Sequence, residues 1–158
     1  MAIGVPRITP HLWFDTQAVE AAEFYASVFP NSRIDKIDRI RDTPSGDCDI
    51  VSFTLADQPF MAISAGPMFK FNEAISLVVP CDTQEEIDHY WSRLAADPAA
   101  GRCGWIKDRY GLSWQIWPKA IAQMMEGADS TAKARVTRAI MASKKFEIVE
   151  LRRALAGE

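Results

Sequence analysis

A repeated tripeptide constrains the fold of this chain more than any other feature. Asp-Thr-Gln occurs at residues 15–17 and again at residues 82–84, so the two copies begin 67 positions apart. In both places an apolar stretch precedes the tripeptide, acidic residues follow it, and an aromatic pair comes next, Phe24-Tyr25 or Tyr90-Trp91. Asp and Thr are favoured helix N-caps. Each copy therefore predicts a strand that leads into a capped helix, with Asp15 or Thr16 as the first cap and Asp82 or Thr83 as the second.

The segments around both predicted helices occur in the same order. Alternating apolar residues and β-formers predict strands at RITPHLWF, RIDKIDRI, DIVSFTL and FMAIS in the first half, and at AISLVVP, CGWIKD and LSWQIWP in the second. The first half is then β-α-β-β-β, and the second is β-α-β-β, one strand short. A half this small cannot bury both its sheet face and its helix alone. We interpret the chain as a duplicated unit, the alternative being that Asp-Thr-Gln is merely a good helix start used twice.

Duplication predicts the domain organisation. We expect an α+β fold in which residues 1–118 form one domain of two tandem modules, 5–65 and 73–118, that share one curved mixed sheet. The helices cover one face of this sheet, and the other face encloses a cavity. Residues 119–158 are predicted to form a helical C-terminal extension, because Ala132, Val136 and Ile140 form one apolar stripe and Ile148 and Leu151 belong to another. These stripes favour packing on the domain or on a partner subunit.

Composition and charge argue against several classes of protein and partner. The net charge of -3 argues against nucleic acid and anionic membranes, and no apolar run approaches the roughly 20 residues of a membrane helix. The first ten residues carry no basic segment followed by an apolar core, so no secretory signal is expected. Cys48, Cys81 and Cys103 are odd in number and form no CxxC pair, which favours isolated thiols over a disulfide framework or a zinc site. We expect a cytoplasmic protein.

Three segments resemble a known family. ITPHLWFDTQAVEAAEFYASVFPNSRI, FKFNEAISLVVPCDTQEEIDHYW and CGWIKDRYGLSWQIWP are similar to the PhnB-like branch of the vicinal oxygen chelate superfamily, which also contains glyoxalase I, bleomycin-resistance proteins and extradiol dioxygenases. The resemblance spans roughly residues 8–118. It implies paired βαβββ modules, a cupped sheet and a homodimer. Members of this branch often carry a name related to 3-demethylubiquinone methyltransferase, yet the sequence has no Gly-rich strand-to-helix turn that would hold S-adenosylmethionine.

The resemblance also implies where metal ligands would lie. In the metalloenzymes of the superfamily, His and Glu side chains project from four strands into the cup, where a divalent ion needs about three or four nitrogen or oxygen ligands. The corresponding positions here are Pro10 or His11 in the first strand, Ser64 in the fourth, Ala74 and Ser76 in the fifth, and Gln115, in place of Glu, in the last. Only His11 is a good ligand. We therefore predict a cup without metal and without a cofactor.

A period of two along LSWQIWP places Ser113, Gln115 and Trp117 on one face of the last strand. If Gln115 faces the cup, as the resemblance implies, the other two do as well, whereas Trp91 and Trp114 belong to the core. The candidate ligand-binding residues are His11, Trp13, Ser64, Ser76, Ser113, Gln115 and Trp117. Such a lining suits an uncharged or aromatic small molecule. No Ser or Cys stands at readable spacing from a base, so the sequence indicates no catalytic residue.

Three hypotheses of function follow. The first is a small-molecule-binding protein of unassigned reaction with a metal-free cup, acting as a homodimer. The second is a metal-dependent lyase, isomerase or dioxygenase whose ligands occupy other positions. The third is a dimerisation module whose cup is filled by its own side chains. The sequence leaves open whether the protein is an enzyme.

Overall fold

The structure, a computed structural model, describes residues 8–158. Residues 5–7 of the first predicted module, and most of the N-terminal segment expected to carry no signal, lie outside the described residues. The chain divides into two compact units, Met1–Lys70 and Phe71–Glu158. None of the described helices is long and apolar enough to span a membrane.

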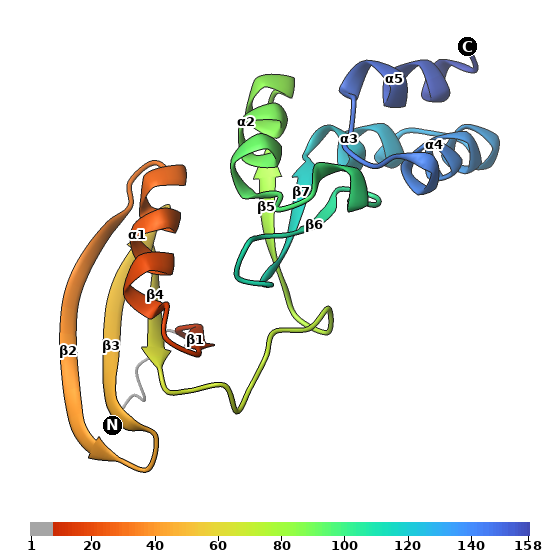
Figure 1. Cartoon of the computed structure of the whole chain (residues 1–158). Helices are drawn as coiled ribbons and strands as arrows, with labels where there is room; N and C mark the ends of the chain where they lie inside the picture. Colours follow the sequence, from red (N-terminus) through yellow and green to blue (C-terminus); the bar gives the residue numbers. More distant parts are fainter. Residues whose placement is uncertain (1–7) are drawn as a thin grey trace, which may run out of the picture. The chain divides into compact units, whose positions relative to one another are not determined.

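The first unit has the predicted order β-α-β-β-β (Figure 1). Its elements are β1 (His11–Phe14), α1 (Ala18–Val28), β2 (Arg33–Thr43), β3 (Gly46–Leu55) and β4 (Gln58–Ser64). The sheet order is β1-β4-β3-β2, with β1 parallel to β4 and the other neighbours antiparallel. Helix α1 packs on one face of this sheet, where Tyr25 of the helix and Val51, Phe53 and Ala62 of the strands are buried. Burial of one face explains the alternation of the sequence.

The predicted caps of α1 are wrong. The N-cap residue is Gln17, and its side chain makes no capping hydrogen bond. Instead, the Ser64 hydroxyl at the end of β4 accepts a hydrogen bond from the backbone N–H of Ala18 at 3.0 Å. An oxygen from a neighbouring strand thus satisfies one of the free N–H groups at the start of the helix, so the helix begins after both Asp15 and Thr16.

The second unit also follows the predicted order, with one strand fewer. Its elements are β5 (Ser76–Cys81), α2 (Gln84–Leu94), the 3-10 turn η1 (Pro98–Ala100), β6 (Trp105–Lys107) and β7 (Ser113–Pro118). The sheet order is β5-β7-β6, with β5 parallel and β6 antiparallel to β7. Where the first unit has β2 after its helix, this unit has only η1, so β6 forms an edge of the sheet. Thr83 caps α2 by accepting a hydrogen bond from the Glu86 N–H at 3.2 Å, as predicted.

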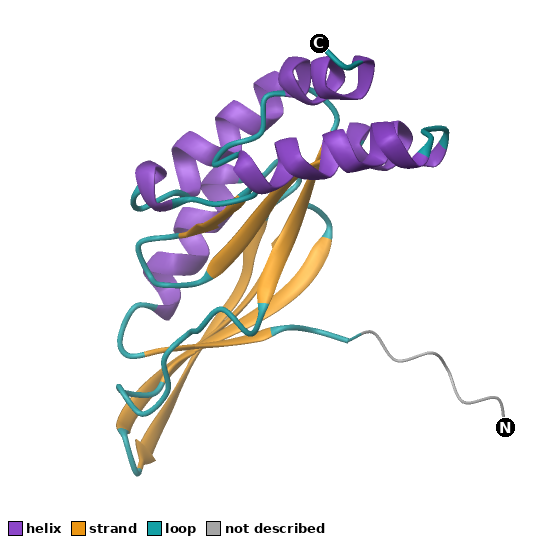
Figure 2. Cartoon of the chain, turned by 90° about the vertical axis from the view of Figure 1, so that its right-hand side faces the viewer, coloured by secondary structure: helices purple, strands orange, loops and turns teal. Residues whose placement is uncertain are grey.

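Residues after Pro118 form the helices α3 (Ala120–Glu126), α4 (Ser130–Ala142) and α5 (Ile148–Ala156), which gather near the C-terminus (Figure 2). The Arg135 guanidinium of α4 donates to the carbonyls of Ala154 and Leu155 at 2.9 and 2.7 Å. These bonds satisfy carbonyls that the end of α5 leaves free, and they tie the two helices together.

The segment between α4 and α5 fixes this tail to the second unit. Phe146 is fully buried, and its ring lies edge-on to Trp117 with centroids 5.5 Å apart. Gln84, the first residue of α2, donates to the Phe146 carbonyl at 3.0 Å and accepts from the Ile148 N–H at 2.9 Å. The Gly104 N–H donates to the Lys144 carbonyl at 2.8 Å. The tail is therefore part of the second unit.

Candidate functional site

The register of the first strand, which the sequence left open, follows from burial. Leu12 and Phe14 are buried on the face that α1 covers, so His11 and Trp13 both lie on the opposite face. The Trp13 indole N–H donates to the Gly66 carbonyl at 2.8 Å, and its ring lies edge-on to Phe69 with centroids 4.9 Å apart. His11 is exposed. Trp13 is thus held by its own unit, whereas the imidazole of His11 remains accessible.

Ser64 does not join these two residues. It shares the alternation of the buried Ala62, and its hydroxyl is engaged at the start of α1. The helix-facing position gives Ser64 a capping role, and the structure does not bring it together with His11 and Trp13.

The second unit does bring three of the predicted residues together. Trp114 and Ile116 of β7 are buried towards α2, so Ser113 and Gln115 lie on the other face. Ser76 is paired in register with Ser113 and shares that face. The Gln115 side-chain amide donates to the Ser76 hydroxyl at 2.7 Å. These side chains form a neutral, hydrogen-bonding cluster on the helix-free face of the sheet.

Ser113 carries the most unusual polar atom of this cluster. The residue is 0% exposed, and its Oγ has no hydrogen-bond partner among the described residues. Buried hydroxyl groups in native structures are nearly always hydrogen-bonded, since an unpaired one costs roughly 1–3 kcal/mol. Ser113 therefore leaves one unpaired hydroxyl on this face, next to the hydrogen bond between Gln115 and Ser76.

Trp117 lies at the far end of the same strand face, and the tail covers it. The Phe146 ring packs edge-on against it at 5.5 Å, and the indole is half-buried. Trp117 therefore forms the boundary between the face and the tail.

Sequence reasoning missed two residues of this face, Trp105 and Lys107. They lie directly opposite Gln115 and Ser113 in the antiparallel pairing of β6 with β7. Directly opposite residues of an antiparallel pair project to the same side. The short connection between the predicted strands CGWIKD and LSWQIWP contained this information, because its length fixes which residues pair.

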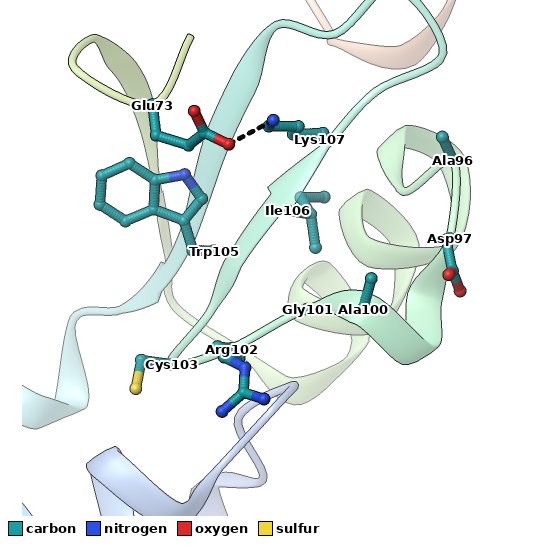
Figure 3. Close-up of a pocket in the computed structure, with 10 residues that line it drawn as sticks. All are labelled: Glu73, Ala96, Asp97, Ala100, Gly101, Arg102, Cys103, Trp105, Ile106 and Lys107. Atoms are coloured by element: carbon teal, nitrogen blue, oxygen red, sulfur yellow. Dashed lines mark ion pairs between the residues drawn. The ribbon is translucent and has the colours of Figure 1, made fainter.

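A groove of about 770 Å³ runs along β6 (Figure 3). We call it the β6 groove, and its lining includes Glu73, Ala96, Ala100, Trp105, Ile106 and Lys107. Most of this lining is apolar. The Trp105 indole N–H is buried and has no hydrogen-bond partner among the described residues. Glu73 forms an ion pair with Lys107, and the hydrogen bond from the Lys107 ammonium lowers the pKa of the Glu73 carboxyl.

The donor groups do not fit the metal that the superfamily implies. Within residues 8–158, no group of three or more His, Cys, Asp or Glu side chains is placed to hold an ion. On the helix-free face of the second unit, the strand residues named above contribute an amide, two hydroxyls, two indoles and an ammonium. The Gln115 amide is neutral and is bound to Ser76. A divalent ion requires several anionic or imidazole donors, and these groups do not supply them.

The turns from strand to helix do not fit S-adenosylmethionine either. A nucleotide-type cofactor needs a Gly-rich turn whose free N–H groups face the ligand. Both turns here carry Asp-Thr-Gln instead of glycine. At the start of α1 the Ala18 N–H donates to Ser64, and at the start of α2 the Glu86 N–H donates to Thr83. The protein's own side chains thus occupy the positions that a cofactor would need.

A buried thiol in the second unit gives a testable expectation. Burial raises the pKa of Cys81 to about 12, with a further contribution from the carboxylates of Glu86 and Asp82. We expect Cys81 to resist alkylation by iodoacetamide in the native protein at mildly alkaline pH, while the partly exposed Cys103 reacts. Peptide mass spectrometry checks this, with protein in urea as the control.

The same shift predicts how stability changes with pH. The folded state holds the Cys81 proton up to about pH 12, whereas the unfolded chain releases it near the ordinary value of 9.0. Stability is unaffected by this group below pH 9 and falls as pH rises from 9 towards 12. Rapid alkylation of native Cys81 would contradict the burial of its thiol.

Together, the two units define an α+β protein built from paired βαβββ-type modules, the second reduced by one strand. A family model described as 3-demethylubiquinone-9 3-methyltransferase matches residues 6–117. The chain therefore belongs to this PhnB-like family, as the sequence motifs indicated.

Solved structures agree with this assignment. The PhnB protein from Bacillus cereus is 34% identical, with a TM-score of 0.60 over 72% of this chain and 99% of that chain. Protein PA1353 from Pseudomonas aeruginosa shares the fold at 17% identity, with a TM-score of 0.58 over 72% of this chain and 98% of that chain. No curated protein matches the sequence. The family model ends at residue 117, so the tail lies beyond the matched domain.

Proposed function

We propose that this PhnB-like protein binds a small aromatic or apolar molecule on the helix-free face of its second unit, without a metal ion. The observation that carries the proposal is the buried Ser113 hydroxyl, which has no partner among the described residues and stands beside the Gln115–Ser76 hydrogen bond. A few fixed polar groups next to an aromatic, mostly apolar groove are typical of small-molecule sites.

The chemistry of the face supports binding more than turnover. Gln115 and Ser76 are neutral, and neither is a strong acid or base. In the second unit, the Cys81 thiol is buried with a raised pKa, which disfavours the thiolate that a nucleophile needs. In this proposal the protein sequesters or carries its ligand, and it does so with a fold of the vicinal oxygen chelate type. The homodimer that the resemblance implies stays a prediction.

A fluorescence titration tests this function. Replacing Gln115 with alanine removes the hydrogen bond to Ser76 and one fixed polar group of the face. We expect the affinity for a neutral aromatic probe such as 2-naphthol, measured by quenching of tryptophan fluorescence, to fall about tenfold. His89→Ala is the matched control, because His89 is exposed on α2 of the same unit.

Two results would contradict the proposal. One is an affinity for every aromatic probe that is identical in Gln115→Ala and the unsubstituted protein. The other is one tightly held zinc, nickel, iron or manganese ion per chain in elemental analysis of protein purified without chelator.

A further inference from the structure

We propose that the β6 groove binds an aromatic carboxylate, and that the Glu73 carboxylate occupies the ligand carboxylate's position when no ligand is bound. This inference rests on the proposed function and adds the charge of the ligand to it. Its starting point is the ion pair between Glu73 and Lys107, two residues that line a largely apolar groove (Figure 3).

Lys107 is the fixed member of this pair. It belongs to β6, and its register opposite Ser113 holds it on the helix-free face. Trp105 lies two residues away on the same face, because side chains of a strand alternate. The Lys107 ammonium therefore stands beside the polar cluster of Ser113 and Gln115, whereas Arg102, the other cation in the lining of the groove, precedes the strand.

Glu73 is the replaceable member. It precedes β5, outside the strands of the sheet, and its side chain is 63% exposed. An exposed ion pair of this kind contributes little to stability, since solvent screens it and two long side chains lose freedom. A ligand carboxylate can thus take the place of Glu73 at little cost to the fold.

Trp105 supplies the second contact. Figure 3 shows the Glu73 side chain beside the nitrogen-bearing ring of this indole, on the side that faces Lys107. Even so, the indole N–H makes no hydrogen bond with Glu73 or with any other described residue. The carboxylate of a free ligand is not tied to the backbone as Glu73 is. It can therefore take a position in which it accepts hydrogen bonds from both the Lys107 ammonium and the Trp105 indole N–H. Hydrogen bonds that involve a charged partner are about twice as strong as neutral ones.

The rest of the groove accommodates the aromatic part. Ala96 and Ala100 present small side chains, and the buried Ile106, which alternates with Trp105 and Lys107 along β6, lines the groove from the helix-covered side. The volume of about 770 Å³ lies within the range of sites for small organic ligands. Because β6 is an edge strand, a flat ring can lie along this edge against Ala96 and Ala100 while its carboxylate reaches Lys107.

A pair of probes that differ mainly in charge tests the inference. Isothermal titration calorimetry is carried out with 2-naphthoate and 2-naphthol on the full chain. We expect 2-naphthoate to bind about tenfold more tightly, and its affinity alone to fall as salt is added. Lys107→Ala should remove this tenfold advantage, so that both probes bind the variant about equally. Glu73→Gln should raise the affinity for 2-naphthoate, because the competing carboxylate is gone.

Lys119→Ala is the matched control, since Lys119 also forms an exposed ion pair, with Asp82, in the same unit. Its binding of both probes should equal that of the unsubstituted protein, and circular dichroism confirms that each variant folds. Equal affinities for the two probes, or an unchanged affinity for 2-naphthoate in Lys107→Ala, would overturn the inference while the proposed function stands. A weaker affinity for 2-naphthoate in Glu73→Gln would overturn the role of Glu73. Absence of binding by both probes would overturn the inference and the proposed function together.

Discussion

Replacing Phe146 with alanine is expected to lower the free energy of unfolding of the second unit by about 3–5 kcal/mol. Phe146 is fully buried and packs edge-on against Trp117 at 5.5 Å. Its ring also fills the space above Gly104, where an added Cβ would stand 2.4 Å from the ring. Truncation to alanine leaves a cavity. The hydrogen bonds of Gln84 with the Phe146 carbonyl and the Ile148 N–H hold the backbone in place, so the site cannot readily collapse.

Urea denaturation followed by tryptophan fluorescence measures this loss, because Trp117 reports on the contact. Met141→Ala is the control, since Met141 belongs to α4 of the same tail and is 70% exposed. That change should alter stability by no more than about 0.5 kcal/mol. A loss below about 1 kcal/mol in Phe146→Ala would mean that the hydrogen bonds of Gln84, and not the buried ring, hold the tail.

The contact at Phe146 could not be predicted from the sequence, although the helices on either side of it could. The stripes of the tail helices were readable, because a helical period is local, and Val136 and Leu151 are indeed buried. Phe146 lies in the connection between two helices, where no period exists. Its partners Trp117 and Gly104 are distant in sequence. Only the fold brings a connecting segment to the end of a strand, so the sequence predicted the tail but not how it is attached.

The elements of the two units were predictable for the same local reason. Alternation identified the strands, and the repeated Asp-Thr-Gln starts identified the helices α1 and α2. Trp91 and Trp114, expected in the core, are 6% and 2% exposed. The cap of α1 was mispredicted because Asp15 and Thr16 are good local caps, whereas the oxygen that the helix uses comes from Ser64 on another strand. A tertiary contact replaced a local preference.

The candidate site was predictable in part. The alternation of β7 and its pairing with β5 place Ser76, Ser113 and Gln115 on one face, and their role in ligand binding stays a prediction. Trp105 and Lys107 were not predicted as site residues, because β6 is only three residues long and its pairing with β7 decides which face they share. Glu73 lies in a linker that carries no periodic signal. These residues are defined by strand pairing and by an ion pair, neither of which composition reveals.

Replacing Asp108 with alanine is expected to destabilise the second unit by about 3–5 kcal/mol. Asp108 is 3% exposed. One of its carboxylate oxygens accepts from the backbone N–H groups of Tyr110 and Leu112 at 2.9 and 3.1 Å. The other accepts from the Trp114 indole N–H at 2.8 Å. Alanine leaves these donors buried without acceptors in the turn that joins β6 to β7, and urea denaturation measures the loss.

Asn provides the matched test, because it keeps the shape and one acceptor oxygen but presents a donor where the second oxygen was. Asp108→Asn should therefore lose about half as much as Asp108→Ala. Asp97→Ala is the exposed control, since Asp97 caps η1 through one hydrogen bond from the Ala99 N–H at 2.9 Å. Equal stability of all three variants would contradict a structural role for the Asp108 carboxylate.

This series also separates two roles for the same carboxylate. A buried acid near a binding face is the kind of group that often proves catalytic. Both oxygens of Asp108, however, accept from the β6–β7 turn and from the core residue Trp114. Under conditions where Asp108→Asn remains folded, its affinity for 2-naphthoate should therefore equal that of the unsubstituted protein. A large loss of affinity with intact stability would instead assign the carboxylate to the ligand.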